Sequence, residues 1–200
     1  MRARETMSLP LGWKPLSMQD TGWSNSSNSL LGFLAMHSNY QLPPAARIGH
    51  VHLKVSNLQQ ALDFYCGLLG FELMTTYGEE AAFISAGGYH HHIGLNTWQS
   101  KGGKPAPKNA AGLFHTAILY PTRKDLALIL QRLLDANYPI SGFADHAVSE
   151  AIYLDDPDEN GVELYWDRPK ELWPTDAQGK MVMYTRTLDV QGLLHELDSL

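Results

Sequence analysis

The sequence contains a single cysteine, Cys66, so it cannot form an intrachain disulfide. This cysteine usage suits a reducing compartment, and we expect a cytoplasmic protein. No apolar run approaches the roughly 18 residues of a membrane span, so we expect no membrane contact. Basic residues are also scarce, with 15 against 21 acidic ones and a net charge of -6. Such a balance lacks the positive footprint of a nucleic-acid-binding protein.

The chain is rich in histidine and has enough apolar residues for a core. It has 200 residues, of which 44% are hydrophobic, and nine histidines. Three of these are consecutive, at His90, His91 and His92. Residues 1–46 show no sustained periodicity and are rich in Ser, Asn, Gly and Pro. We expect this segment to be a poorly ordered N-terminal extension.

From residue 47 onward a regular pattern begins, and it occurs twice. An alternating strand over 48–55 precedes a helix that Ser56 or Asn57 can cap and Gly70 ends, and three strand-like segments follow. After a Gly-, Pro- and Lys-rich linker, a second strand over 113–120 starts the same order again. The repeated order of strand, helix and three strands predicts an α+β fold made of two tandem modules.

These patterns divide the chain into four parts. We expect the extension at 1–46, a first βαβββ module with its linker at 47–110, and a second βαβββ module at 111–168. The remaining residues, 169–200, form a tail with a short amphipathic helix. Each sheet has one face covered by its own helix, so the other faces must be buried or used.

Three polar residues lie at related positions of the strands. His50 and His115 occupy the same place in the two first strands, 65 residues apart. Glu163 follows an acidic turn and alternates with Val162 and Leu164, so it points away from the apolar face. A lone Glu at such a position is usually solvated. Together, two imidazoles and one carboxylate are the ligand set of a non-haem Fe(II) oxygenase.

The first half lacks a counterpart of Glu163. The equivalent residue there is Gly94, so a symmetric fourth protein ligand is missing and the expected metal site stays open. An octahedral ion with three protein ligands has room for a catechol, bound as a chelate, and for dioxygen.

The segments 48–70, 113–120 and 155–166 resemble the vicinal oxygen chelate superfamily. That superfamily includes glyoxalase I, bleomycin-resistance proteins, fosfomycin-resistance enzymes and extradiol dioxygenases. The resemblance covers about residues 47–168 and implies that the two mixed sheets form a cupped, open barrel around a metal site. Within the superfamily, the chain resembles the catechol 2,3-dioxygenases.

This resemblance implies a set of roles. His50, His115 and Glu163 would bind Fe(II), with Mn(II) as an alternative, and His92 would act as the acid/base. His146 would bond the substrate oxygens together with Tyr153, which lies ten residues before the glutamate. The substrates would be a small aromatic diol and O2. Many such enzymes carry four modules and this chain has two, so we expect a homodimer.

Other interpretations remain open. A glyoxalase I-type lyase or isomerase would use a second carboxylate, which Gly94 does not provide. A non-catalytic protein that binds a drug or an aromatic ligand would not need a complete set of metal ligands. His52 lies on the same face as His50, and we expect it to be a pocket residue.

Overall fold

The computed structural model describes residues 40–198. The chain divides into two compact units, Met1–Arg47 and Ile48–Leu200. Of the first unit, residues 40–47 are described: they are exposed, with a turn closed by a hydrogen bond from Ala46 N to Pro43 O (2.8 Å). The expected extension at 1–46 thus lies largely outside the described residues. Within the described part of the chain, no helix is long and apolar enough to cross a membrane.

The first module of the second unit contains four strands and one helical segment. These are β1 (Val51–Lys54), α2 (Leu58–Leu62) running into the π-helical turn η1 (Asp63–Leu68), β2 (Glu72–Tyr77), β3 (Ala81–Ser85) and β4 (Ile93–Asn96). The Asn57 side chain caps α2 by accepting a hydrogen bond from Gln60 N (3.1 Å), as expected for this residue type. Gly70, with φ of 87°, follows the end of the helical segment.

The second module repeats this order. It consists of β5 (Thr116–Leu119), α3 (Arg123–Asp135), β6 (Gly142–Asp145), β7 (Ser149–Asp155) and β8 (Gly161–Asp167). Thr122 caps α3 by accepting a hydrogen bond from Asp125 N (3.0 Å). The tail adds η2 (Lys170–Leu172), α4 (Val190–Leu194) and η3 (His195–Leu197).

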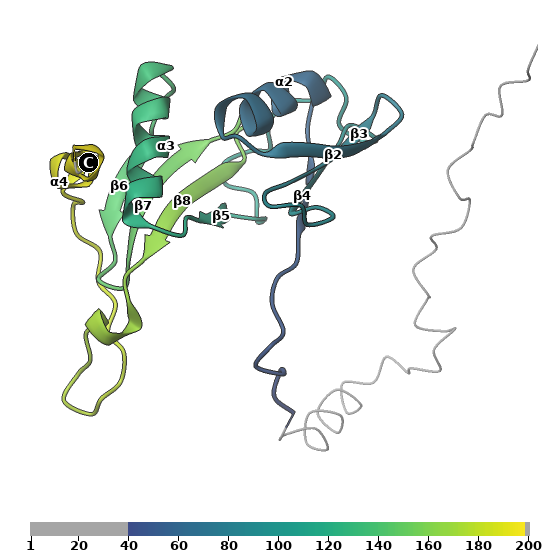
Figure 1. Cartoon of the computed structure of the whole chain (residues 1–200). Helices are drawn as coiled ribbons and strands as arrows, with labels where there is room; N and C mark the ends of the chain where they lie inside the picture. The colour runs from purple at the N-terminus through teal and green to yellow at the C-terminus, as the bar shows by residue number, and fades with distance from the viewer. Residues whose placement is uncertain (1–39, 199–200) are drawn as a thin grey trace, which may run out of the picture. The chain divides into compact units, whose positions relative to one another are not determined.

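The strands form two four-stranded mixed sheets with the same topology. Their orders are β1-β4-β3-β2 and β5-β8-β7-β6. β1 runs parallel to β4, and β5 runs parallel to β8. The other neighbouring strands in both sheets are antiparallel. Figure 1 shows α2 beside the first sheet and α3 beside the second. The predicted α+β class and the duplicated βαβββ order are confirmed; the sheets are separate and do not form a closed barrel.

A buried core joins the two modules. Side chains from α2, η1, α3 and both sheets belong to one apolar cluster, including Phe64, Leu95, Leu130 and Leu164. Burying each such side chain contributes about 1.5–3 kcal/mol to folding. Polar bonds also cross between the modules: the buried Tyr65 hydroxyl donates to Asp156 Oδ2 (3.1 Å). The turn between β7 and β8 is thereby attached to the helical segment of the first module.

The tail is fastened to the edge of the second sheet. Asp145 on β6 and Arg186 exchange two backbone hydrogen bonds of 2.9 Å each. The guanidinium of Arg168 bonds Asp145 and Glu150, both at 2.7 Å. Figure 1 shows the tail leaving β8 and returning to α4. The pairing of Arg186 with Asp145 brings the neighbouring Thr185 close to β6.

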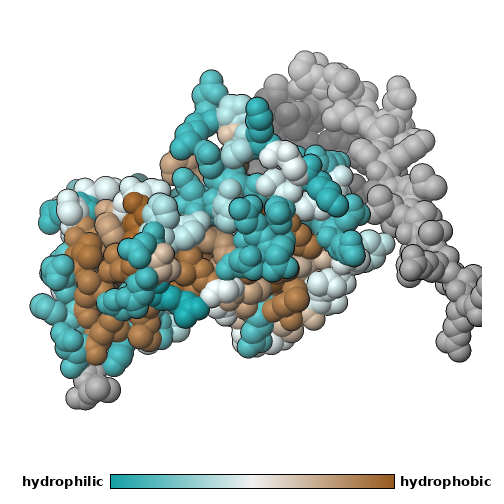
Figure 2. Space-filling model, turned by 90° about the horizontal axis from the view of Figure 1, so that it is seen from above, coloured by the Kyte–Doolittle hydropathy of each residue, from teal (hydrophilic) through white to brown (hydrophobic). Residues whose placement is uncertain are grey.

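Some large apolar side chains remain exposed in the described part of the chain. Leu73 and Met74 on β2 are 50% and 39% exposed, and Leu128 on α3 is 52% exposed. In Figure 2, brown apolar areas alternate with teal polar areas on the face shown. Exposed apolar area of this kind is compatible with the expected homodimer, which stays a prediction.

Candidate functional site

Two rows of side chains cross the sheets at equivalent positions. In the second sheet, β5, β8 and β7 align Ala117, Glu163 and Tyr153, which we call the acidic row. In the first sheet, β1, β4 and β3 align His52, Gly94 and Phe83, which we call the aromatic row. This register makes Gly94 the counterpart of Glu163, as the sequence predicts. His115 and His50 each lie two residues before the first member of their row.

The acidic row is the centre of a continuous chain of polar contacts. Glu163 Oε2 lies 2.9 Å from His115 Nε2, and Glu163 Oε1 accepts a 2.9 Å hydrogen bond from the Tyr153 hydroxyl. His146 Nε2 lies 2.7 Å from the Tyr153 oxygen. The Glu163 side chain is 12% exposed, so these contacts replace most of the water that its carboxylate would otherwise bind.

The directions of these hydrogen bonds follow from the ionised carboxylate, which can only accept. Tyr153 gives its one proton to Glu163, so its oxygen must accept from His146 Nε2–H. In the neutral imidazole, His146 Nδ1 is then the acceptor, facing Thr185 Oγ1 at 3.2 Å. Burial raises the pKa of Tyr153, and the hydrogen bond to Glu163 and the charge of that carboxylate raise it further. The phenol therefore remains a proton donor at neutral pH.

His50 and His92 belong to the first module and take no part in the polar contacts that join His115, Glu163, Tyr153 and His146. The His50 ring packs against His91, with ring centroids 4.3 Å apart. His92 Nδ1 accepts a hydrogen bond from Ala86 N (3.3 Å) and lies 3.0 Å from Ser85 Oγ. Because Ala86 N–H can only donate, the neutral His92 ring carries its proton on Nε2.

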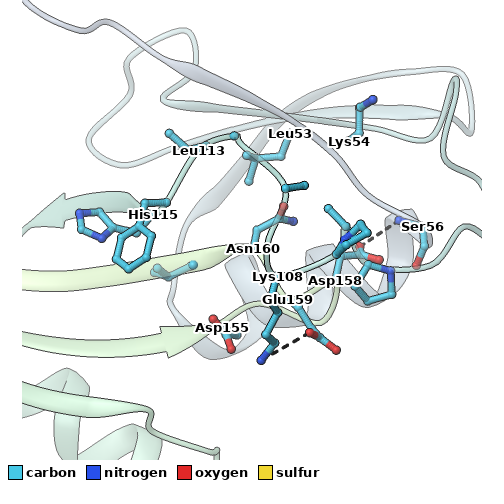
Figure 3. Close-up of a pocket in the computed structure, with 18 of the residues that line it drawn as sticks. Leu53, Lys54, Ser56, Lys108, Leu113, His115, Asp155, Asp158, Glu159 and Asn160 are labelled. Atoms are coloured by element: carbon cyan, nitrogen blue, oxygen red, sulfur yellow. Dashed lines mark hydrogen bonds and ion pairs between the residues drawn. The ribbon is translucent and has the colours of Figure 1, made fainter.

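Two cavities meet at His115. One of about 600 Å³ is lined by His50, His92 and His115 among other residues. The second, of about 860 Å³, is lined by His52, His115 and Tyr153, by the linker and by the turn after β7. Figure 3 shows His115 near Leu113 at one side of a pocket, with Asp158 and Glu159 toward the other. His115 therefore lines both cavities. Glu163 lines neither of them and lies behind its hydrogen-bond partners His115 and Tyr153.

A bound metal ion needs several donor side chains close together. Among residues 40–198, no three histidine, cysteine, aspartate or glutamate side chains are close enough together to hold an ion. The structure brings His115 and Glu163 together, and His50 shares only a cavity with His115. His115 Nε2 and Glu163 Oε2 are 2.9 Å apart. Two neighbouring ligand atoms on one ion, each bonded at about 2.1 Å, have this spacing. The imidazole and carboxylate donors of His115 and Glu163 suit a divalent metal ion.

One further observation concerns the imidazole of His115. Its Nδ1 is buried and has no hydrogen-bond partner among the described residues. An unpaired buried nitrogen costs free energy, and such groups are often found at functional sites. His115 is thus held by Glu163 alone on its polar side.

Sequence reasoning did not identify three contributors to the site. Thr185 reaches His146 only because the tail pairs with β6, and no local pattern announces that pairing. The linker residues that line the larger cavity show no regular pattern that would mark them as pocket residues. Phe83 on β3 pairs with Gly94 on β4. The register of this antiparallel pair could have indicated Phe83 as a neighbour of Gly94.

Comparison with known proteins defines the family. Residues 47–164 match the glyoxalase/bleomycin resistance protein/dioxygenase superfamily, and the chain belongs to this superfamily. A solved glyoxalase/dioxygenase from Nostoc punctiforme has a similar fold, with a TM-score of 0.54 and 17% sequence identity. That likeness covers 66% of this chain and 99% of the other.

Curated relatives with higher identity are dioxygenases. The chain is 41% identical over 150 residues to catechol-2,3-dioxygenase of Bacillus subtilis (strain 168), covering 74% of this chain. It is 30% identical over 121 residues, 60% of its length, to biphenyl-2,3-diol 1,2-dioxygenase 2 of Rhodococcus globerulus. The chain spans 51% of the length of the first relative and 63% of the second.

Proposed function

We propose that this chain is an extradiol ring-cleaving dioxygenase that acts on catechol-type aromatic diols and uses Fe(II), with Mn(II) as the alternative. The observation that carries the proposal is the connected set His115, Glu163, Tyr153 and His146, in which His115 lines both cavities and Tyr153 lines the larger one. The names of the two dioxygenase relatives support the same reaction class. Both atoms of O2 enter the product, so the reaction needs no external reductant.

The metal would be held by His50, His115 and Glu163. A bound Fe(II) would supply electron transfer between the diol and O2 and positions for both. Glu163 provides the single negative charge of the ligand set and is already oriented by Tyr153. His50 must leave its packing against His91 to complete the set. Metal affinity is therefore expected to depend strongly on the carboxylate and on the freedom of His50.

The remaining residues would handle protons. In the structure the Tyr153 proton points to Glu163 and the His146 Nε2 proton points to Tyr153. Once the Glu163 oxygen binds a metal, the phenol proton would turn to an oxygen on which negative charge develops. His92 lines the other cavity and, with Nδ1 occupied by Ala86 N–H, has a proton on Nε2 to donate. We propose that these three residues exchange protons with the diol oxygens and the opening ring.

The alternatives that the sequence leaves open are less well supported. A glyoxalase I-type site needs a carboxylate at position 94, where a glycine lies beneath the His52 ring. A non-catalytic binding protein would not require the hydrogen-bonded chain from Glu163 to His146. The homodimer stays a prediction.

The test is reconstitution without oxygen. Protein loaded anaerobically with Fe(II) should, when catechol and O2 are added, consume O2 and form a yellow ring-opened semialdehyde in equal amounts. Glu171→Gln, an exposed change on η2, serves as the matched control for Glu163→Gln. Absence of O2 uptake by the loaded wild-type protein, across catechols with different substituents, would rule out the proposal.

A further inference from the structure

The aromatic row of the first module is packed differently from the acidic row of the second. A Cβ atom at Gly94 would lie 2.9 Å from Cγ and Cδ2 of His52 and 3.1 Å from its Cε1. Similar distances to three ring atoms mean that the imidazole lies flat over the glycine. The ring therefore occupies the space in which a side chain at position 94 would start.

Two further aromatic rings hold this imidazole. Phe83 meets His52 in an edge-on contact, with ring centroids 5.8 Å apart and an angle of 69°. Trp98 lies 5.6 Å from the His52 centroid at an angle of 56°. With Gly94 beneath and these two rings beside it, the imidazole has little freedom to rotate.

The held imidazole also reaches a cavity. His52 lines the cavity of about 860 Å³, whose other lining residues include His115 and Tyr153. A ligand in this cavity can thus contact an aromatic ring from the first module while its polar groups approach the acidic row of the second. Flat aromatic molecules make favourable edge or offset contacts with such rings.

We propose that His52, held by Gly94, Phe83 and Trp98, is the residue of the first module that recognises the aromatic ring of the ligand. This inference rests on the proposed function for the identity of that ligand as an aromatic diol. A fixed ring loses little conformational entropy when a ligand binds, so its contacts contribute more fully to affinity. The aromatic row would select a planar ring, and the acidic row would act on its oxygens.

The first experiment measures binding without turnover. Absorbance titration with 4-nitrocatechol in the absence of O2 compares the metal-loaded wild-type protein with His52→Ala, His52→Phe and the exposed control His195→Ala. We expect His52→Ala to raise the Kd about fivefold, consistent with one aromatic contact. His52→Phe should stay within about twofold, and His195→Ala should match the wild type. An unchanged Kd in His52→Ala would overturn the inference.

Steady-state kinetics distinguishes this inference from the proposed function. If catechol is cleaved, the loss in His52→Ala should fall mainly on KM, and His52→Phe should recover most of it. If catechol is not cleaved but the Kd for 4-nitrocatechol still depends on His52, the ring-recognition inference holds and the dioxygenase proposal fails. A wild-type protein that binds no 4-nitrocatechol would overturn the ring-recognition inference, and O2 uptake with catechol decides the dioxygenase proposal separately.

The second experiment tests the packing without any metal. Gly94→Ala places a Cβ against the His52 ring and should lower the melting temperature by about 5 °C. The same substitution in a His52→Ala background should cost much less, because the ring is gone. Equal losses in both backgrounds would show that the imidazole does not lie over Gly94, and would overturn the inference.

Discussion

Tyr153 and Glu163 face each other across β7 and β8, and the phenol donates its proton to the carboxylate over 2.9 Å. Because the tyrosine has one proton, this bond fixes the direction of the bond from His146 as well. The carboxylate thus orders two side chains that lie ten and seventeen residues earlier in the chain.

Tyr153→Phe removes the phenol oxygen and leaves the ring. We expect the mutant to fold and kcat for catechol to fall by about 10- to 100-fold, since a hydrogen bond to a charged group contributes about 1.5–3 kcal/mol. Stopped-flow detection of the yellow product gives the rate, and circular dichroism checks the fold. A mutant as fast as the wild type would show that Tyr153 only supports Glu163 structurally.

Glu163→Gln keeps the shape of the side chain and removes its charge. We expect the protein to lose most of its Fe(II) on gel filtration, because the remaining nitrogen ligands suit a hard cation poorly. His92→Ala should retain the metal and slow turnover instead. Metal analysis of both proteins, purified without oxygen or chelators, makes the comparison. Metal loss from His92→Ala would contradict its assignment as a proton-transfer residue.

Thr185→Val replaces the hydroxyl that faces His146 Nδ1 with a methyl group. Because Thr185 is exposed and water can substitute, we expect kcat to fall only about two- to threefold. Thr185→Ser keeps the hydroxyl and should keep the wild-type kcat. Thr187→Val, on the same exposed segment, is the matched control. Nitrogen-15 spectra of histidine-labelled protein should show the same Nε2-protonated tautomer of His146 in Thr185→Val and in the wild type, because the bond to Tyr153 sets that tautomer.

The pair formed by Asp145 and Arg168 predicts a loss of stability in acid. Burial alone would raise the pKa of Asp145, but hydrogen bonds from Arg168 and Ala147 N–H and the charges of Arg168 and Arg186 outweigh it and lower the pKa. A carboxyl group with a lower pKa in the folded state stabilises the fold above its unfolded pKa of about 3.9. That stabilisation disappears as the pH falls further.

We therefore expect the wild type to melt at a higher temperature than Asp145→Asn at pH 6 and the difference to shrink below about pH 4. Thermal melts from pH 2.5 to 7 provide the measurement, with Glu79→Gln as an exposed control. A difference that stays constant over this range would exclude the carboxylate charge as its cause.

Tyr65→Phe tests the bond between the modules. The Tyr65 hydroxyl is buried and donates to Asp156, which also accepts from Asp158 N and Asn160 N. We expect a loss of about 1–3 kcal/mol in the free energy of unfolding, because the acceptor is a carboxylate. Urea denaturation measures it, and Tyr40→Phe, at a residue 72% exposed, should change nothing.

Local signals in the sequence predicted the elements and their order. Asn57 and Thr122 cap the helices as their residue types predict, and alternation placed Val162 and Leu164 on the core face of β8 and Glu163 on the opposite face. His50 and His115 lie just before their strands and not within them, because the ladders begin at Val51 and Thr116.

Contacts between distant segments could not be predicted in the same way. The placement of Thr185 depends on pairing between the tail and β6, and the separation of His50 from Glu163 depends on how the two sheets meet. Neither is encoded in a local period. Tyr153 and Glu163 are ten residues apart and lie opposite each other, because β7 and β8 are joined by a tight turn. The sequence interpretation assigned Tyr153 to the substrate oxygens and did not predict its hydrogen bond to Glu163.

The imidazole lying over Gly94 also limits the order in which this half of the molecule could change during evolution. A glutamate introduced at position 94 while His52 is present would meet the ring at once, whereas shortening position 52 first leaves room for it. Of the two orders in which positions 52 and 94 could change, only the one that begins at position 52 avoids an intermediate in which the new side chain overlaps the His52 ring.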